Sequence, residues 1–313
     1  MIGKLLTVSS IFIAILASGF YARFRQIEAS HVPSGIQSTS FDEVAPDLYR
    51  FGRTWTLVKT VLEVHISTFL IKSGKDYILI DAGVPSANYT DHLIPALKAA
   101  TKHGNLRWIL LTHGHTDHIG SLPALLEAFP KAQLAMHILE APYVGGGVSY
   151  AAVPADNWVY VVSRRLLPPD DLHLPVHRLL FLAGESGDVS EAKGSAGQAP
   201  AWVPPAGLLE YVHVPGHAPG QMAFLHRPSS SLLPADVITN LGGTAFFGKP
   251  APAALGYPPP GSSCNWTQHA LDWQALAKLD FTTAFPSHDI ETGVPKAAVV
   301  ESAEKLAPLK ASA

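Results

Sequence analysis

Hydrophobic residues occur in short, regularly spaced runs over the first third of the chain, each bounded by polar or turn-forming residues. Runs rich in β-branched and aromatic residues are typical of strands, and Gly74 supplies a hairpin turn between two of them. A longer segment at 89–102 instead carries Leu93 and Leu97 at helical spacing, which predicts an amphipathic helix. The first strands are predicted at 48–51, 56–64, 67–71 and 77–80.

The same change of period recurs along the chain, so that strand-rich regions are followed by helices. A buried strand at 106–111 leads into a helix at 119–129, and the C-terminal half again ends in two helices. Two such halves predict an α+β fold in which two stacked sheets lie between outer helices, a four-layer αββα sandwich. Further strands are predicted at 131–136, 208–214, 222–226, 231–233 and 281–285, and helices at 267–279 and 296–306.

Two segments depart from this alternation. Residues 183–207 hold few large apolar side chains and many Gly, Ser, Ala and Pro residues, which predicts a mobile surface insertion that the chemistry does not need. Residues 157–167 read as a short amphipathic helix after a glycine-rich break at 145–147. This second region is a candidate cap over a pocket.

The N-terminus carries a segment unlike the rest. Residues 5–22 are mostly apolar and have basic residues on both sides, so residues 1–25 are predicted to be a signal peptide or a membrane anchor. We therefore expect the protein to enter the secretory pathway and to be secreted or anchored in a membrane by this segment. Residues 26–44 are then a linker, and residues 45–313 form one domain.

Composition narrows the choice of partner. Hydrophobic residues make up 47% of the chain, charged residues 15%, and the net charge is −3. These values argue against disorder and against a basic nucleic-acid-binding surface, and we expect a small-molecule substrate instead. The single cysteine, Cys264, allows no internal disulfide.

Three histidines and one aspartate are packed into residues 113–118, directly after the predicted strand at 106–111. Neutral imidazole nitrogens and a carboxylate suit zinc and similar divalent cations, and burying so many titratable groups without an ion would be costly. The alternative is a solvated polar turn. A metal site at the end of a rigid strand is the preferred interpretation.

The same event recurs elsewhere, because Asp81, His217, Asp236 and His288 each stand just after a predicted strand. Taken singly, each of these residues is more often an ordinary turn or core residue. Together with the 113–118 cluster, they predict strand ends that converge on one site and supply ligands from both halves of the fold.

The chain resembles the metallo-β-lactamase superfamily of metal-dependent hydrolases. The resemblance rests on Asp81 in Ile-Asp-Ala-Gly, the His-x-His-x-Asp-His of residues 113–118, His217 in Pro-Gly-His, Asp236 and His288, in that order. It covers about residues 45–290 and implies the αββα fold. One departure is Ala235, where many relatives have glycine before the bridging aspartate.

The resemblance also implies the roles of the site residues. One metal ion would be bound by His113, His115 and His217, and a second by Asp117, His118 and His288, with Asp236 bridging the two. Asp81 would orient the ligands by accepting hydrogen bonds, and Asp117 would also relay a proton to the leaving group. We expect two divalent ions, zinc first, with iron or manganese as alternatives.

Two such ions would lower the pKa of a shared water from about 15.7 towards 7 and polarise a carbonyl oxygen. The predicted activity is therefore hydrolysis of an ester, lactone, thioester or amide bond in a small substrate, by a lactonase-like or glyoxalase II-like enzyme without the glyoxalase II C-terminal domain. Two alternatives stay open: an oxidoreductase resembling persulfide dioxygenases with one iron, and a non-catalytic binding protein stabilised by its metals.

Overall fold

The computed structural model describes residues 37–58, 62–102, 104–145, 147–156, 174–195, 199–240, 244–246, 249–250, 254–258, 262–289 and 293–306. The apolar segment at 5–22 and the predicted helix at 157–167 lie outside these residues. Within the described part of the chain, no helix is long and apolar enough to cross a membrane.

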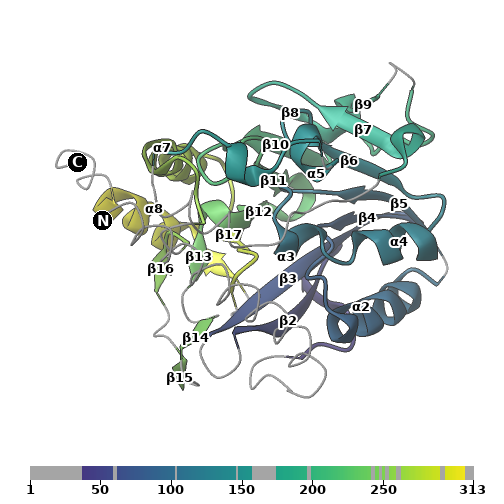
Figure 1. Cartoon of the computed structure of the whole chain (residues 1–313), viewed down its shortest axis with the longest axis horizontal. Coiled ribbons are helices and arrows are strands. Elements are labelled where there is room, and N and C mark those ends of the chain that lie inside the picture. The colour runs from purple at the N-terminus through teal and green to yellow at the C-terminus, as the bar shows by residue number, and fades with distance from the viewer. Residues whose placement is uncertain are drawn as a thin grey trace, which may run out of the picture.

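The first sheet is built mainly from the N-terminal half of the chain (Figure 1). Its N-terminal strands pair antiparallel up to β4, and β4, β5, β6 and β7 then run parallel. In order across the sheet, the strands are β1 (Asp42–Ala45), β2 (Leu48–Val58), β3 (Leu62–Ser73), β4 (Asp76–Ile80), β5 (Asn105–Leu110), β6 (Gln133–His137), β7 (Leu179–Leu182) and β9 (Lys193–Gly194). Off this path, β14 (Thr244–Phe246) pairs with β3 and with β15 (Lys249–Pro250).

The second sheet comes mainly from the C-terminal half. Its order is β18 (Val294–Pro295), β17 (Thr283–Ala284), β12 (Ser231–Leu233), β11 (Met222–His226), β10 (Leu209–His213) and β8 (Ser186–Asp188). A separate small ladder joins β13 (Thr239–Asn240) to β16 (Leu255–Gly256).

Helices cover the outer face of each sheet, which gives the four layers seen in Figure 1. The helices α2 (Ala87–Ala100), α3 (Thr116–Ile119) and α4 (Leu122–Ala128) pack on the first sheet, and α7 (Trp266–Ala277) and α8 (Lys296–Leu306) pack on the second. The remaining short helices are α5 (Ala141–Val144), η1 (Tyr150–Ala152), η2 (Val176–Arg178), η3 (Val189–Glu191), η4 (Arg227–Ser229) and η5 (Ala235–Val237). The predicted αββα sandwich is confirmed.

Side-chain alternation explains why the first sheet is buried on both faces. In β3, Ile66 and Leu70 belong to the core beneath the helices, while Phe69 and Ile71 belong to the core between the two sheets. Within β3 the apolar run at 69–71 therefore supplies side chains to both cores. The central core also contains Trp108, which is fully buried.

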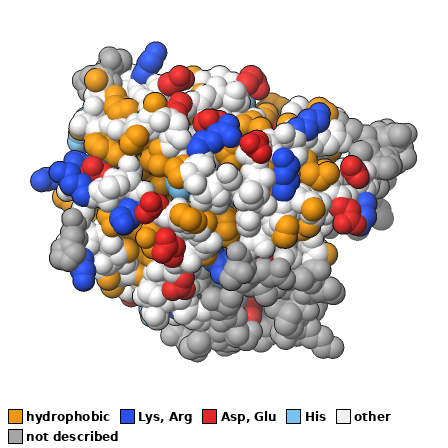
Figure 2. Space-filling model, turned by 180° about the vertical axis from the view of Figure 1, so that it is seen from behind, with side chains coloured by type: hydrophobic (Ala, Val, Ile, Leu, Met, Phe, Trp, Pro, Cys, Tyr) orange, Lys and Arg blue, Asp and Glu red, His pale blue; other side chains and the backbone are white. Residues whose placement is uncertain are grey.

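Charged side chains of both signs are interspersed on the face shown in Figure 2, together with scattered hydrophobic ones. Among the described residues of this face, charged side chains of one sign do not gather into a large patch. A strong long-range field that would steer a charged partner is therefore not expected from this side.

The end of the predicted linker at 26–44 is corrected by the structure, because residues 42–45 form β1. Glu43 lies opposite Tyr49 on β2, and Pro46 and Asp47 make the turn between the two strands. Asp47 has φ 57°, a left-handed conformation that aspartate tolerates better than most residues. The predicted break at 52–55 is also wrong, since β2 runs unbroken from Leu48 to Val58.

The predicted surface insertion at 183–207 is corrected as well. Its strand β8 pairs with β10 in the second sheet, and its strand β9 pairs with β7 in the first. Val189 is fully buried between these strands, and Trp202 packs edge-on against Trp108 with ring centroids 5.9 Å apart. The segment therefore closes the edges of both sheets. Strands of two or three residues are too short to show a period in the sequence.

Candidate metal centre

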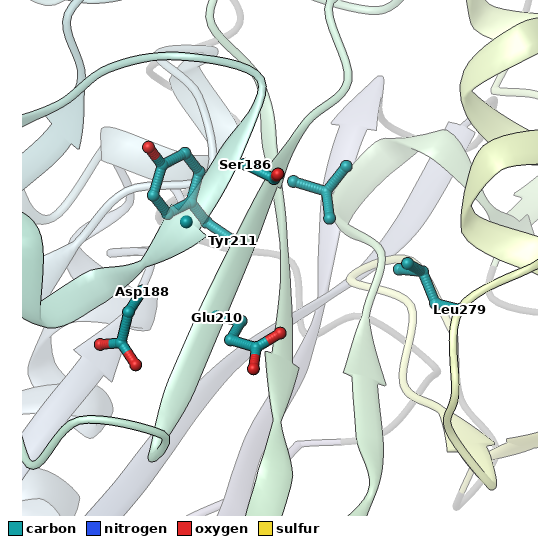
Figure 3. Close-up of a pocket in the computed structure, with 7 residues that line it drawn as sticks. Ser186, Asp188, Glu210, Tyr211 and Leu279 are labelled. Atoms are coloured by element: carbon teal, nitrogen blue, oxygen red, sulfur yellow. The ribbon is translucent and has the colours of Figure 1, made fainter.

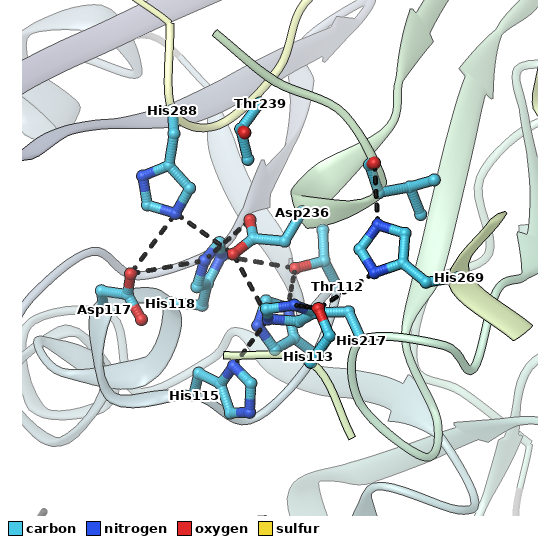
Figure 4. A network of polar contacts seen from close by, with 12 residues as sticks. Thr112, His113, His115, Asp117, His118, His217, Asp236, Thr239, His269 and His288 are labelled. Atoms are coloured by element: carbon cyan, nitrogen blue, oxygen red, sulfur yellow. Dashed lines mark hydrogen bonds and ion pairs between the residues drawn. The ribbon is translucent and has the colours of Figure 1, made fainter. Parts of the chain in front are cut away.

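All of the predicted site residues lie at the ends of strands, and the fold brings these ends together (Figure 4). Asp81 follows β4 and the 113–118 cluster follows β5, both in the first sheet. His217 follows β10, Asp236 lies in η5 after β12, and His288 follows β17, all in the second sheet. The site is thus formed between the two halves, as the sequence predicted.

The potential ligand atoms fall into two groups. Within each group these atoms lie within 4.8 Å of one another, the spacing expected around one ion. The first group is His113, His115 and His217, and the second is Asp117, His118, Asp236 and His288. Every member except Asp117 is buried, so the donors are held by the protein interior.

Asp236 connects the two groups. Its Oδ2 lies 3.4 Å from Nε2 of His217 in the first group and 3.2 Å from Nε2 of His288 in the second. Its Oδ1 lies 3.2 Å from Nε2 of His118. One carboxylate therefore faces histidine nitrogens of both groups, which is the position of a bridging ligand.

These separations fit a small divalent cation. Two donors that each lie about 2.0–2.1 Å from a tetrahedral zinc ion are about 3.3–3.4 Å apart. The Nε2 of His118 and Oδ1 of Asp236 are buried atoms without a hydrogen bond, although only 3.2 Å separates them. Nδ1 of His115 and Nε2 of His217 are closer, at 2.8 Å. Buried potential ligand atoms that converge this closely suit a cation.

Asp81 orients the ring of His118 through a hydrogen bond. Its Oδ2 accepts a hydrogen bond from Nδ1 of His118 at 2.8 Å, while Oδ1 accepts one from the backbone N–H of Thr112, also at 2.8 Å. Because Nδ1 is the donor, Nε2 of His118 keeps its lone pair for the site. Asp81 adopts φ 62°, a strained conformation for a residue other than glycine.

His288 is oriented by the backbone of β3. Its Nδ1 donates to the carbonyl oxygen of His65 at 2.9 Å, so that Nε2 faces Asp236 and Asp117. A carbonyl oxygen can only accept, which fixes the proton on Nδ1. The first sheet thus orients a ligand that belongs to the second.

The electrostatics of the second group favour positive charge. Burial by itself lowers the pKa of His118, but the carboxylates of Asp236, Asp81 and Asp117 outweigh it and raise the pKa well above its ordinary value. The pKa of His288 is raised to about 9, because Asp236 and Asp117 outweigh its burial. A field that attracts protons to these nitrogens also attracts a divalent cation.

Glu140 joins the two ligand-bearing loops, and the sequence analysis missed it. Its buried carboxylate accepts hydrogen bonds from the backbone N–H of Gly114 at 2.8 Å and of Gly220 at 2.6 Å. The hydroxyl of Tyr150 donates to the same carboxylate. A Cβ at Gly114 would come within 2.4 Å of Val144, so only glycine allows this approach. No motif surrounds Glu140, and only the fold brings it between the loops.

The backbone conformation at Ala235 accounts for the glycine that many relatives have at this position. Its φ is 49°, in the left-handed region where glycine is favoured over residues with a Cβ. The position before Asp236 therefore needs a left-handed backbone, and this chain accommodates alanine there. The carboxylate of Asp236 keeps its bridging position.

A surface groove of about 310 Å³ lies apart from this cluster (Figure 3). It is lined by residues of β8 and β10 together with Leu279, and its polar groups include the carboxylates of Asp188 and Glu210. None of its lining residues belongs to either candidate metal group.

The fold and the histidine–aspartate site define a metal-dependent hydrolase class, and comparisons with known proteins agree. The family model of the metallo-beta-lactamase superfamily matches residues 62–288. The chain belongs to this superfamily, which confirms the resemblance seen in the sequence.

Individual relatives match this chain over only part of its length or at low sequence identity. A probable metallo-hydrolase, YybB of Bacillus subtilis, is 30% identical over 181 residues, which are 56% of this chain and 63% of that protein. The chain thus spans less than two thirds of that relative's length. A hydroxyacylglutathione hydrolase of Anaeromyxobacter dehalogenans is 44% identical over 62 residues, 20% of this chain and 21% of that one. A metallo-beta-lactamase structure from Erythrobacter litoralis superposes with a TM-score of 0.52 at 17% identity, covering 85% of this chain and 96% of the other, and shows the shared fold.

Proposed function

We propose that this protein is a hydrolase that uses two divalent metal ions, zinc being the best match to the donors, to cleave an ester, lactone, thioester or amide bond of a small molecule. The observation that carries the proposal is the position of Asp236, whose Oδ2 lies 3.4 Å from His217 and 3.2 Å from His288. One carboxylate shared by two histidine groups supports two neighbouring ions rather than one.

The assignment of ligands follows the two groups. His113, His115 and His217 would hold one ion through imidazole nitrogens only. Asp117, His118 and His288 would hold the other, with Asp236 between them. Bound there, divalent ions supply Lewis acidity that activates water and polarises a carbonyl group.

Asp117 is the member of the cluster best placed to exchange protons with a substrate. Its side chain is 27% exposed, whereas that of Asp236 is only 5% exposed. Its Oδ2 faces Nε2 of His288 at 3.4 Å, which holds the carboxylate at the edge of the site. We infer that Asp117 carries a proton to the leaving group, as a general acid must reach both the site and the departing atom.

The substrate class rests on supporting arguments. One relative of this chain is named as a hydroxyacylglutathione hydrolase, which is a thioesterase, and this supports a thioester among the candidate substrates. Position 236 is an aspartate, and the chain's one cysteine stands at 264. We therefore favour oxygen esters, lactones and thioesters over β-lactams.

The test is a hydrolysis panel with zinc-loaded protein, spanning lactones, simple esters, thioesters and β-lactams. We expect turnover of at least one of the first three classes and a loss of at least 1,000-fold in His115→Ala, because that variant removes a ligand. The exposed His177, which lies outside both groups, gives the matched control His177→Ala with activity like wild type. A protein that holds one iron per chain and consumes oxygen instead would overturn the proposal.

A further inference from the structure

A chain of buried hydrogen bonds leads away from His217 and ends beside Asp236 (Figure 4). Nδ1 of His217 lies 3.0 Å from Oγ of Ser263, and the same Oγ lies 3.0 Å from Nδ1 of His269. Nε2 of His269 lies 2.9 Å from the carbonyl oxygen of Val237, the residue after Asp236. Ser263 and His269 are fully buried.

The direction of each hydrogen bond follows from the last one. The carbonyl oxygen of Val237 can only accept, so Nε2 of His269 carries a proton. A neutral imidazole ring carries only one proton, so Nδ1 of His269 is the nitrogen with the lone pair. That nitrogen must accept, so the hydroxyl of Ser263 donates to it.

The single hydroxyl proton of Ser263 is then directed at His269, so its oxygen receives the proton on Nδ1 of His217. His217 is thereby held in the tautomer whose Nε2 bears a lone pair. That Nε2 faces Oδ2 of Asp236 at 3.4 Å and Nδ1 of His115 at 2.8 Å.

We propose that Ser263 and His269 are positioning residues that fix the tautomer and ring orientation of His217 for metal binding. This inference rests on the proposed function, since it assigns His217 as a ligand. Two of the three histidines flanking Asp236, His118 and His288, are oriented by a carboxylate and a carbonyl oxygen. At Nδ1 of His217 the hydroxyl of Ser263, directed by His269, takes the corresponding position.

The local packing supports a fixed arrangement rather than a chance contact. A Cβ at Gly216 would come within 2.2 Å of both the backbone N and the Cα of His269, so α7 packs directly against the loop that carries His217. The backbone N–H of Cys264 donates to the carbonyl oxygen of His217 at 3.2 Å, which holds the Ser263 segment against the same loop. The loop, the helix and the serine are therefore packed directly against one another.

The decisive readout is the tautomer of His217 in the metal-free protein, measured by long-range proton–nitrogen NMR on ¹⁵N-histidine-labelled samples. We expect Nδ1 protonated and Nε2 unprotonated in the wild type, and a mixture of tautomers in Ser263→Ala. We also expect Ser263→Ala to weaken zinc binding about 10- to 100-fold in a chelator competition, the usual effect of removing a group that orients a ligand. His269→Phe should have the same two effects.

The matched control is Ser229→Ala, which removes the hydroxyl 2.7 Å from Nδ1 of His226, a buried histidine outside the metal groups. It should change neither the His217 tautomer nor the zinc affinity. Ser263→Thr, which retains a hydroxyl, should restore both.

The outcomes separate this inference from the proposed function. Wild-type protein that binds no zinc would refute the metal site, while its NMR spectrum would still decide the tautomer. Zinc binding by Ser263→Ala at wild-type strength, or a proton on Nε2 of His217 in the wild type, would overturn the inference alone. If Ser263→Ala fails to fold, His269→Phe and the wild-type spectrum provide the same decision.

Discussion

The orientation of single side chains in this site is fixed by hydrogen-bond partners that can only accept or can only donate. Asp81 illustrates the point, because its two oxygens divide their roles between the backbone of Thr112 and the ring of His118. The residue also adopts φ 62°, which costs on the order of 1–3 kcal/mol and is compensated by these hydrogen bonds. The sequence predicted an orienting role for Asp81, and its contacts fit that role.

Replacement of Asp81 by alanine should affect the two ions unequally. His118 would lose the acceptor that holds its ring, so zinc affinity at the second group should fall about 10- to 100-fold, while His113, His115 and His217 keep their contacts. Zinc per chain, measured after dialysis against a weak chelator, should drop by about half. The exposed Asp91, changed to alanine, is the control. Equal loss of both ions would contradict the separate roles of the two groups.

Residues such as Glu140, Ser263 and His269 could not be predicted from the sequence. The candidate ligands can be recognised in the sequence because they stand in a dense motif or directly after a predicted strand. Glu140 follows β6 at a distance from every motif, and His269 lies within a helix whose pattern predicts only packing. Their roles arise from contacts between segments distant in the chain, which one sequence without structure does not contain.

At the scale of elements, loops that carry ligands are held together by buried carboxylates. Glu140 spans the loop of His113 and His115 and the loop of His217, which belong to different sheets. A residue outside both candidate metal groups therefore connects the loops that carry the first group.

We predict that Glu140→Ala destabilises the protein and disturbs the first metal group. The buried backbone N–H of Gly220 would lose its acceptor, at about 1–3 kcal/mol, and that of Gly114 would keep only the hydroxyl of Tyr150. Urea unfolding of the metal-free protein would measure this loss. Glu127, exposed on α4, supplies the control Glu127→Ala, which should change the unfolding free energy by less than about 0.5 kcal/mol. A wild-type value for Glu140→Ala would show that the loops do not need this carboxylate.

Asp272 on α7 is a second carboxylate of this kind, and it makes stability depend on pH. Its Oδ2 accepts from the N–H of Gly216 at 2.7 Å, and burial raises its pKa from 3.8 to about 6. The folded protein therefore holds this proton more tightly than the unfolded chain does. The contribution of Asp272 to stability is greatest below about pH 4 and declines as the pH rises to about 6.

Asp272→Asn should remove this dependence, because the amide stays neutral. Relative to wild type, the variant should gain on the order of 2 kcal/mol between pH 4 and pH 6. Unfolding of metal-free protein across this range is the measurement, with the exposed Asp280→Asn as control. A constant difference between variant and wild type would mean that Asp272 titrates normally.

The sequence predicted most elements, including the short strands β11 and β12, and misassigned β8 and β9. Strands β4, β5, β6 and β10 and helices α2, α7 and α8 were found within a few residues, because their apolar positions repeat over several residues. The strands β8 and β9 were assigned to a surface insertion, and the break between β2 and β3 was misplaced. Pairing with distant strands decides these cases, and a run of two or three residues carries no signal of it.

At the scale of the whole molecule, the sandwich explains why the ligands come from both halves. Each sheet contributes candidate ligands from its strand ends, and the central core packs the two sheets against each other. The site exists only when both halves are folded and packed. This arrangement agrees with the fold and the superfamily. The side chains that surround the site decide which substrate it accepts.

The N-terminal segment gives a prediction at this scale. We propose that residues 5–22 direct the protein into the secretory pathway, since their apolar run is bounded by basic residues. A C-terminally tagged full-length chain should fractionate with membranes or the secreted material, and deletion of residues 1–25 should leave it in the cytosol. Full-length protein found only in the cytosol would contradict the proposal.

The central claim is that seven side chains from two sheets hold two metal ions bridged by Asp236. The most direct test is the number of zinc ions per chain after reconstitution of metal-free protein and gel filtration, measured by elemental analysis for wild type and Asp236→Ala. The account predicts about two ions in the wild type and a clear loss in the variant, since both groups lose a shared ligand. No retained zinc in the wild type, or equal zinc in both proteins, would contradict it.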